Sequence, residues 1–362
     1  MILCRGCKKP IFGDYTKALG FDWHKPCFVC TICHRPFPDH QFVAHEGKPY
    51  CQRDYHEKFG ELCPGCGQLI TNQYIEALGQ KWHKDHFVCT TCGKPFPDGA
   101  FLQHEGKAYC ERDFYENFGT RCSVCHEPVR GQYFTDSWEN SFCGRHTQEL
   151  RQCFTCRRLI CEGITGGGVD YEDGRRMCNL CRKSAIDDLE DALPLFSKVQ
   201  KVLEKQGLGL DKNVRMPLRL ASESDIDLLA GGTPQIEAGI SVLEVLSING
   251  LETARNVTEI VILYGLPITH ASAIMAHELG HVWCLLNHMP DLSSPVQEGI
   301  CEMFSYGYLS QLDTPESRFH MKGIEDNHDP VYGGGFRLVR DALRGRTLAA
   351  LLKDVKTHGD LC

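Results

Sequence analysis

Hydrophobic periodicity divides the C-terminal half of the chain into a helix followed by strands. Between positions 184 and 203 apolar residues recur every three or four positions, which predicts an amphipathic helix interrupted near Pro194. The following segments are rich in β-branched residues and are separated by turn signals such as Asn249-Gly250. We expect strands at residues 214–220, 240–246 and 259–264. The last of these would be either an edge strand that binds an extended substrate or a buried central strand.

Beyond Pro267 the pattern becomes helical again. Residues 268–287 keep an apolar stripe along one face. A second helix is expected to start at Ser294, because this serine can act as the N-cap and Pro295 suits the first helical position. Gln297, three residues after the serine, would complete a capping box.

The first of these two helices carries His277 and His281 one turn apart on the same face, with Glu278 between them. The spacing His-Glu-x-x-His is typical of zinc peptidases, in which both imidazoles bind one metal. The zinc lowers the pKa of a water toward about 7, and the glutamate acts as the general base. Because such a short motif also recurs by chance, the interpretation depends on a third ligand.

Glu298 is the expected third ligand of this catalytic zinc. It lies where thermolysin-like peptidases, the gluzincins, carry their ligand glutamate. Glu302 follows one helical turn later and would orient a zinc-bound histidine through its second ring nitrogen. The reverse assignment, with Glu302 as the ligand, remains open. Metzincins are excluded, because Cys284 and Asn287 occupy the positions where they need glycine and histidine.

A further group is needed to stabilise the oxyanion of the reaction. Tyr332 is the first candidate, and His328 and His320 are the others. Residues 331–336, which include three consecutive glycines, are expected to form a mobile turn at a helix start that could bring the phenol into the cleft. A tyrosine that simply packs at a helix end is the alternative.

The N-terminal half is organised by cysteines. Eighteen of the 22 form three successive groups of six, five and seven. Cys4, Cys63 and Cys122 begin three segments at a spacing of 59 residues, and the first two segments share the sequences Trp-His-Lys, Phe-Val-Cys and His-Glu-Gly-Lys. Close Cys-x-x-Cys pairs among histidines and aspartates indicate metal ligands in a reducing compartment. The fixed period indicates an array of small modules.

The first two segments resemble LIM domains, tandem zinc modules that bind proteins rather than DNA. Each supplies ligands for two zinc ions, which would contribute on the order of 10 kcal/mol of folding free energy per site. The first segment offers Cys4, Cys7, His24 and Cys27, then Cys30, Cys33, Cys51 and Asp54. The second offers Cys63, Cys66, His83 and His86, then Cys89, Cys92, Cys110 and Asp113.

The third segment is a divergent LIM-like variant. Six residues separate its two quartets instead of two, and Cys161 is a surplus thiol that could replace a neighbour as ligand. The expected ligands are Cys122, Cys125, Cys143 and His146, then Cys153, Cys156, Cys178 and Cys181. The whole chain would then bind seven zinc ions, six structural and one catalytic. The array serves as a protein-binding surface or, alternatively, as a passive spacer.

Composition limits the partners and the compartment. The net charge is −8 and no basic run is present, which argues against nucleic acid as a partner. The first residues do not resemble a secretory signal, and no apolar stretch is long enough to span a membrane. We therefore expect a protein of the cytoplasm or nucleus that acts on protein substrates.

The combination of LIM modules with a zinc peptidase domain resembles the ubiquitin-activated LIM-domain metallopeptidases of plant organ-size control. This resemblance implies a latent intracellular peptidase that responds to ubiquitin and cleaves proteins of the ubiquitin system. The sequences that carry it are Leu263-Tyr264-Gly265-Leu266-Pro267, Ala276-His277-Glu278, Glu298-Gly299-Ile300-Cys301 and Tyr332-Gly333-Gly334-Gly335-Phe336-Arg337.

The expected fold is of the α+β class, with tandem zinc modules followed by a gluzincin-like domain. The expected divisions are 1–60 and 61–119 for two LIM domains, 120–184 for the divergent module, 185–206 for a connecting helix and 207–362 for the peptidase domain. Two other functions are considered. One is an inactive LIM scaffold with a peptidase-like domain, and the other is a zinc aminopeptidase or deubiquitinating hydrolase.

Overall fold

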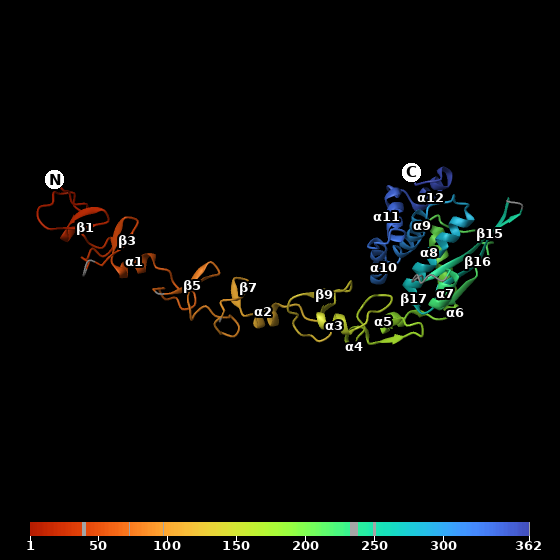
Figure 1. The fold of residues 1–362 in the computed structure, drawn as a ribbon, viewed down its shortest axis with the longest axis horizontal. Coiled ribbons are helices and arrows are strands. Elements are labelled where there is room, and N and C mark those ends of the chain that lie inside the picture. The colour runs from red at the N-terminus through yellow and green to blue at the C-terminus, as the bar shows by residue number, and fades with distance from the viewer. Residues whose placement is uncertain (38–40, 72, 97, 232–237, 249–250, 362) are drawn as a thin grey trace. The chain divides into compact units, whose positions relative to one another are not determined.

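The computed structural model describes the whole chain except residues 38–40, 72, 97, 232–237, 249–250 and 362 (Figure 1). The turn expected at Asn249-Gly250 therefore lies outside the described residues. The chain forms two compact units, Met1–Gly119 and Thr120–Cys362. Each unit is described by itself.

The first unit contains two modules of the same construction. In each, two antiparallel two-stranded hairpins are followed by a short helix. The first module consists of β1 (Tyr15–Ala18), β2 (Phe21–His24), η1 (Lys25–Cys27), β3 (Val43–His45), β4 (Lys48–Tyr50) and α1 (Gln52–Phe59). The second consists of β5 (Tyr74–Ala77), β6 (Gln80–His83), β7 (Leu102–His104), β8 (Lys107–Tyr109) and α2 (Glu111–Phe118).

The apolar cores of these modules are small. In the second module Phe87 is buried and packs against Trp82, Phe96 and Phe101. A core of this size cannot offset the conformational entropy of folding, so each module depends on cross-links such as bound zinc.

The second unit begins with the third zinc module. It contains β9 (Tyr133–Thr135), β10 (Ser141–Cys143), α3 (Gly144–Glu149), α4 (Glu162–Thr165), β11 (Gly168–Asp170), β12 (Arg176–Cys178) and α5 (Asn179–Arg182). Its pairs β9–β10 and β11–β12 are antiparallel, as in the first two modules.

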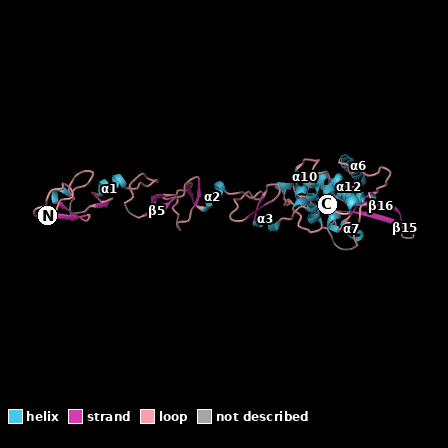
Figure 2. Ribbon diagram, turned by 90° about the horizontal axis from the view of Figure 1, so that it is seen from above, coloured by secondary structure: helices cyan, strands magenta, loops and turns pink. Residues whose placement is uncertain are grey.

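A three-stranded sheet and six α-helices longer than ten residues form the remainder of this unit in the described part of the chain. The sheet order is β14-β16-β15, with β14 parallel and β15 antiparallel to β16. Figure 2 shows the helices gathered around these strands. The elements are β13 (Ala185–Ile186), α6 (Leu189–Lys205), β14 (Leu218–Ala221), α7 (Glu223–Leu229), β15 (Gly239–Ile248), β16 (Leu251–Leu263), β17 (Leu266–Pro267), α8 (Ile268–Leu286), α9 (Ser294–Leu309), α10 (Pro315–Glu325), α11 (Tyr332–Leu343) and α12 (Leu348–His358).

The strand expected at residues 259–264 is the end of β16, which is the central strand of this sheet. Ile260, Val261 and Ile262 are fully buried, so both faces of the strand are covered. The central position explains its imperfect alternation, because a strand buried on both faces is apolar throughout. Among the described strands of this sheet, β15 lies at the edge beside α8.

Helix α6 runs without a break through Pro194. The apolar residues Phe196, Val199 and Leu203 of this helix are buried in the main core. This packing offsets the hydrogen bond lost at the proline, so the expected interruption does not occur.

The start of α9 differs by one residue from the expectation. The N-cap is Ser293, not Ser294, and no side chain caps the helix, so the predicted capping box is absent from this described helix end. Pro295 lacks an N–H, and the first N–H groups of any helix have no partner within it. A proline therefore fits anywhere in the first turn and does not fix which residue begins the helix.

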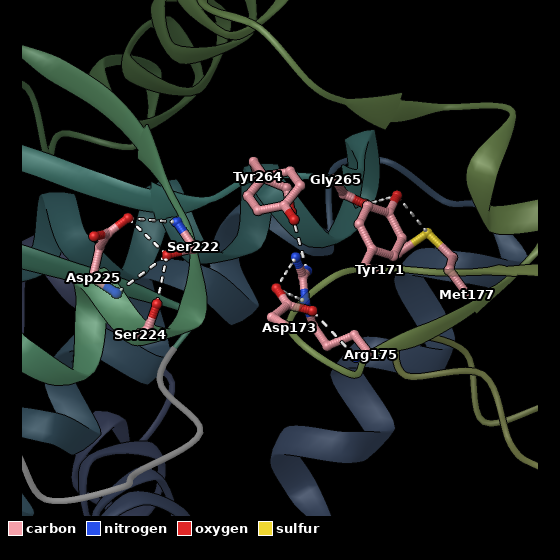
Figure 3. Close-up of polar contacts among 9 residues, drawn as sticks. All are labelled: Tyr171, Asp173, Arg175, Met177, Ser222, Ser224, Asp225, Tyr264 and Gly265. Carbon is pink, nitrogen blue, oxygen red and sulfur yellow. Dashed lines mark hydrogen bonds and ion pairs between the residues drawn. The ribbon is translucent and has the colours of Figure 1, made fainter.

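The third module packs directly on the start of α8 (Figure 3). Strand β13 pairs with β17, and the N–H of Ile268 donates to the carbonyl of Ser184 at 2.8 Å. The Arg175 guanidinium, whose side chain is 2% exposed, donates to the carbonyl of Tyr264 at 3.0 Å and pairs with Asp173 at 2.8 Å. The module and the helix that follows β17 therefore belong to one packed body.

Aromatic contacts extend this packing to α10. Trp138 of the third module stacks on Phe319, with ring centroids 5.1 Å apart. Arg158 covers the Trp138 ring at 3.4 Å from its centroid. Tyr171 closes on Gly265, which has a φ of +76° and no room for a side chain because a Cβ would lie 2.7 Å from the tyrosine ring.

Candidate zinc site of the C-terminal domain

Helices α8 and α9 bring three candidate ligand atoms together. The Oε2 of Glu298 lies 3.3 Å from the Nε2 of His277 and 3.5 Å from the Nε2 of His281. All three side chains are largely buried. Two candidate ligands come from successive turns of α8 and the third from the first turns of α9, so the fold brings together the three residues named from the sequence.

The spacing of these atoms fits a shared metal ion better than direct pairing. Glu298 Oε2 is buried, yet within the described residues it makes no hydrogen bond. Ligands at about 2.0–2.1 Å from a tetrahedral zinc are separated from one another by roughly 3.3 Å. Two imidazole nitrogens and one carboxylate oxygen also form a donor set typical of catalytic zinc.

The histidines and the carboxylates of this group favour each other's charged forms. Burial disfavours the charged imidazole, yet the contact with Glu298 and the nearby carboxylates raise the pKa of His277 to about 9. Burial raises the pKa of Glu298, but His277 and His281 outweigh it and lower that pKa to about 2. The carboxylate is therefore ionised at neutral pH and available to a cation.

Glu302 lies behind His277. Its Oε1 is 3.7 Å from the Nδ1 of His277, the ring nitrogen that does not face Glu298. Burial raises the pKa of Glu302. This arrangement matches a carboxylate that orients a histidine from outside the ligand set.

Glu278 is held by a residue that sequence reasoning missed. Its side chain is 5% exposed, and its Oε2 accepts a hydrogen bond from the Oγ of Ser241 at 2.7 Å. Ser241 lies on β15, 37 positions before Glu278. A serine in a strand carries no signal that would connect it with a distant helix, so the motif alone could not reveal it.

Of the three oxyanion candidates, Tyr332 has a ring that lies near the ring of His277. Its ring lies 6.4 Å from the ring of His277, centroid to centroid. Its backbone N–H donates to Oδ1 of Asp329 at 2.9 Å, which fixes the start of α11. The glycines expected in a mobile turn lie inside the first turn of α11. Of the three, Gly335 allows a close approach to α9, and Gly333 lies against the backbone of Asn327.

The other two oxyanion candidates are placed differently. His320 stacks on His270 with ring centroids 4.6 Å apart. Burial lowers the pKa of His320 to about 4. His328 is exposed in the segment before α11.

The cysteine and histidine clusters of the three modules fit zinc binding. The ligand atoms lie within 4.8 Å of one another in each of the following groups: Cys4, Cys7, His24 and Cys27; Cys30, Cys33, Cys51 and Asp54; Cys63, Cys66, His83 and His86; Cys122, Cys125, Cys143 and His146; Cys153, Cys156, Cys178 and Cys181. In the second LIM module Cys89 Sγ also lies 3.2 Å from Asp113 Oδ2, beside Cys92 and Cys110.

The first cysteine of each module is prepared for metal binding. Burial opposes ionisation of Cys4, Cys63 and Cys122, but backbone hydrogen bonds lower the pKa of each thiol to about 6. Cys161 lies outside the last quartet, at the N-cap of α4, where its N–H donates to Thr165 Oγ1 at 3.2 Å. The quartet Cys153, Cys156, Cys178 and Cys181 is complete without it.

Comparison with known proteins matches two separate parts of the chain. Residues 4–59 and 63–118 match the LIM domain family. The chain thus contains two LIM domains, and their cysteine and histidine clusters fit zinc binding. The third module lies outside both of these matches.

Residues 199–318 match the family described as DA1-like, Protein DA1. This segment includes His277, His281, Glu298 and Glu302, whereas Tyr332 lies beyond it. The chain therefore combines two LIM domains with a DA1-like domain, which confirms the resemblance to the LIM-domain proteins of plant organ-size control.

Paxillin-B of Dictyostelium discoideum is a further relative. It is 36% identical over 198 residues, which represent 52% of this chain and 34% of Paxillin-B. The chain thus matches about a third of the length of that relative. Within the described residues, no helix combines the length and apolar character needed to cross a membrane.

Proposed function

We propose that the second unit is a zinc-dependent peptidase and that the LIM array binds its protein partners. The observation that carries the proposal is the convergence of Glu298 Oε2 on the Nε2 atoms of His277 and His281, with Glu278 beside them. These three residues would hold the zinc. Bound there, zinc would polarise a peptide carbonyl and make a water molecule more acidic.

The chain's own groups supply the proton transfers. Glu278 accepts the proton of the attacking water and then donates it to the leaving amine. Glu302 holds the ring of His277 in the tautomer that leaves Nε2 free to act as a ligand. Tyr332, beside His277, supplies a hydroxyl to the developing oxyanion.

Strand β15 provides a place for an extended substrate. It is one of the two edge strands of the described sheet and touches α8 through Ser241. A peptide segment could pair with its free edge by main-chain hydrogen bonds and reach Glu278. The DA1-like match supports protein substrates, including those of the ubiquitin system, and the likeness to Paxillin-B supports protein binding by the LIM modules.

Glu278→Gln tests the proposal, because this change removes the base but none of the three ligands. We expect the variant to keep its zinc and to lose cleavage of a denatured protein by at least a hundredfold. Metal analysis and thermal unfolding verify that the variant is otherwise intact. Equal turnover by the wild type and the variant would overturn the peptidase and favour the scaffold.

N-terminal blocking of the substrate separates the peptidase from an aminopeptidase. An endopeptidase cleaves a substrate with an acetylated N terminus, whereas an aminopeptidase needs the free amine. We expect cleavage of both forms at similar rates.

A further inference from the structure

Ser241 is the polar residue of β15 that touches the candidate general base. Its Oγ lies 2.7 Å from Oε2 of Glu278 and 3.1 Å from the backbone carbonyl of the same residue. The shorter of the two distances, to the side chain, is typical of a hydrogen bond from a hydroxyl to a carboxylate. The hydroxyl has a single proton, which the shorter distance assigns mainly to the carboxylate, with the backbone carbonyl as a secondary acceptor.

Strand β15 is pressed against α8 where this contact occurs. Gly239, two positions before Ser241, lies on the same face of the strand. A Cβ at Gly239 would lie 3.1 Å from Oε1 of Glu278 and would collide with Ile274 one turn earlier. The absence of a side chain at 239 therefore lets the strand approach closely enough for the serine at 241 to reach the carboxylate.

A glutamate needs such support to act as a base at a fixed point. Its side chain has three rotatable bonds, and the terminal one is broad rather than confined to a few wells. Within the described residues, the Glu278 carboxylate accepts its side-chain hydrogen bond from Ser241. Once Oε2 is engaged, Oε1 is the oxygen left to take a proton.

We propose that Ser241 is a positioning residue for Glu278, holding one carboxylate oxygen so that the other meets the attacking water. The inference rests on the peptidase function proposed above. Ser241 keeps its own proton throughout, donates only a hydrogen bond and neither attacks nor transfers a group. The hydroxyl of Ser241 thereby links the edge strand β15 to helix α8.

The test compares Ser241→Ala and Ser241→Thr with Ser247→Ala, which makes the same deletion at an exposed position of β15. The full chain is assayed on one denatured protein substrate, and kcat and KM are measured separately. We expect Ser241→Ala to lower kcat about ten- to a hundredfold with KM changed less than about threefold, because a misplaced base affects the transition state and not binding. Ser241→Thr, which keeps the hydroxyl, should recover most of kcat, and Ser247→Ala should match the wild type.

Measuring the zinc content and the thermal unfolding of each variant distinguishes a misplaced Glu278 side chain from a loss of the fold or of the metal. A kcat for Ser241→Ala equal to that of the wild type, while Glu278→Gln is inactive, would overturn this inference alone. A loss that threonine does not recover, or that accompanies loss of zinc, would also overturn it in favour of a structural role. An inactive wild type would overturn the peptidase function and the role of Ser241 together.

Discussion

Gly299 of α9 and Gly335 of α11 meet backbone to backbone. A Cβ on Gly299 would overlap the carbonyl of Gly335, and a Cβ on Gly335 would overlap the carbonyl of Pro295. The contact lies next to Glu298 in the sequence, and Tyr332 begins the same helix as Gly335. The two glycines therefore set the distance between a candidate ligand and the candidate oxyanion group.

Gly335→Ala should destabilise the second unit by roughly 3 kcal/mol, because the two helices must separate to admit a methyl group. Thermal or denaturant unfolding measures the change. Gly334→Ala is the matched control, since a Cβ there would meet its nearest neighbour at an ordinary 3.6 Å. That variant should be neutral or slightly more stable, because alanine favours helix more than glycine does. Equal effects at both positions would contradict the close approach.

Metal content distinguishes the two glutamates of α9. The full chain should bind seven zinc ions, and Glu298→Ala should reduce the number by one because it removes a ligand atom. Glu302→Gln should keep seven ions and weaken zinc binding by about ten- to a hundredfold, because its contact is with the ring of His277. Metal analysis after dialysis against a chelator of graded strength measures both. The opposite pattern would assign Glu302 as the ligand.

Arg175 and Arg176 are neighbours in the sequence, but we expect their replacement by alanine to have very different effects on stability. Arg175 is buried against Asp173 and the carbonyl of Tyr264, so Arg175→Ala should cost about 3 kcal/mol by leaving a buried charge without a partner. Arg176 pairs with Asp170 at the surface, and Arg176→Ala should cost less than about 1 kcal/mol.

The location of the destabilised segment is as informative as the loss of unfolding free energy. Hydrogen exchange should increase at the N-terminal turn of α8 in Arg175→Ala and not in Arg176→Ala. Increased exchange confined to the third module would show that the module and helix α8 unfold separately.

His320 gives the stability of the second unit a dependence on pH. The pKa of His320 is about 4 in the folded chain, while an unfolded histidine titrates near 6.5. Between these values the unfolded chain binds a proton that the folded chain does not, so stability falls as pH falls. This group contributes up to about 1.4 kcal/mol per pH unit in that range.

Replacing His320 by leucine removes this contribution. Relative to the wild type, His320→Leu should be more stable at pH 5 than at pH 7.5, as judged by denaturant unfolding at both values. His358→Leu, at an exposed position of α12, serves as the control and should differ from the wild type equally at the two pH values. If the difference in stability between His320→Leu and the wild type does not change with pH, the imidazole of His320 is hydrated in the folded chain.

The candidate ligand residues could be named from the sequence because their chemistry is local. His277 and His281 share a helix face by spacing alone, and a cysteine pair two residues apart needs no knowledge of the tertiary structure. Glu298 followed from a helix that the sequence also indicated, although the cap of that helix was wrong by one residue.

The contacts that depend on distant packing could not be predicted in this way. The hydrogen bond from Ser241 to Glu278 joins a strand to a helix, and the sequence around either residue does not indicate the contact with the other. The glycines after Tyr332 were interpreted as a source of mobility, because a run of glycines has the same sequence whether it lies in a loop or under another helix. The buried strand β16 was ambiguous for a related reason, since apolar runs do not reveal which neighbours cover them.

The contacts of the third module with Tyr264 and Gly265 determine where the protein can be divided. A fragment that begins at residue 185 or 199 would lose the partners of these two residues and expose the first turn of the helix that carries the histidines. The shortest stable fragment that contains the candidate zinc site should instead begin near Thr120, where the compact unit itself begins. The third module resembles one more member of the zinc array, but it belongs to the same folding unit as the DA1-like domain.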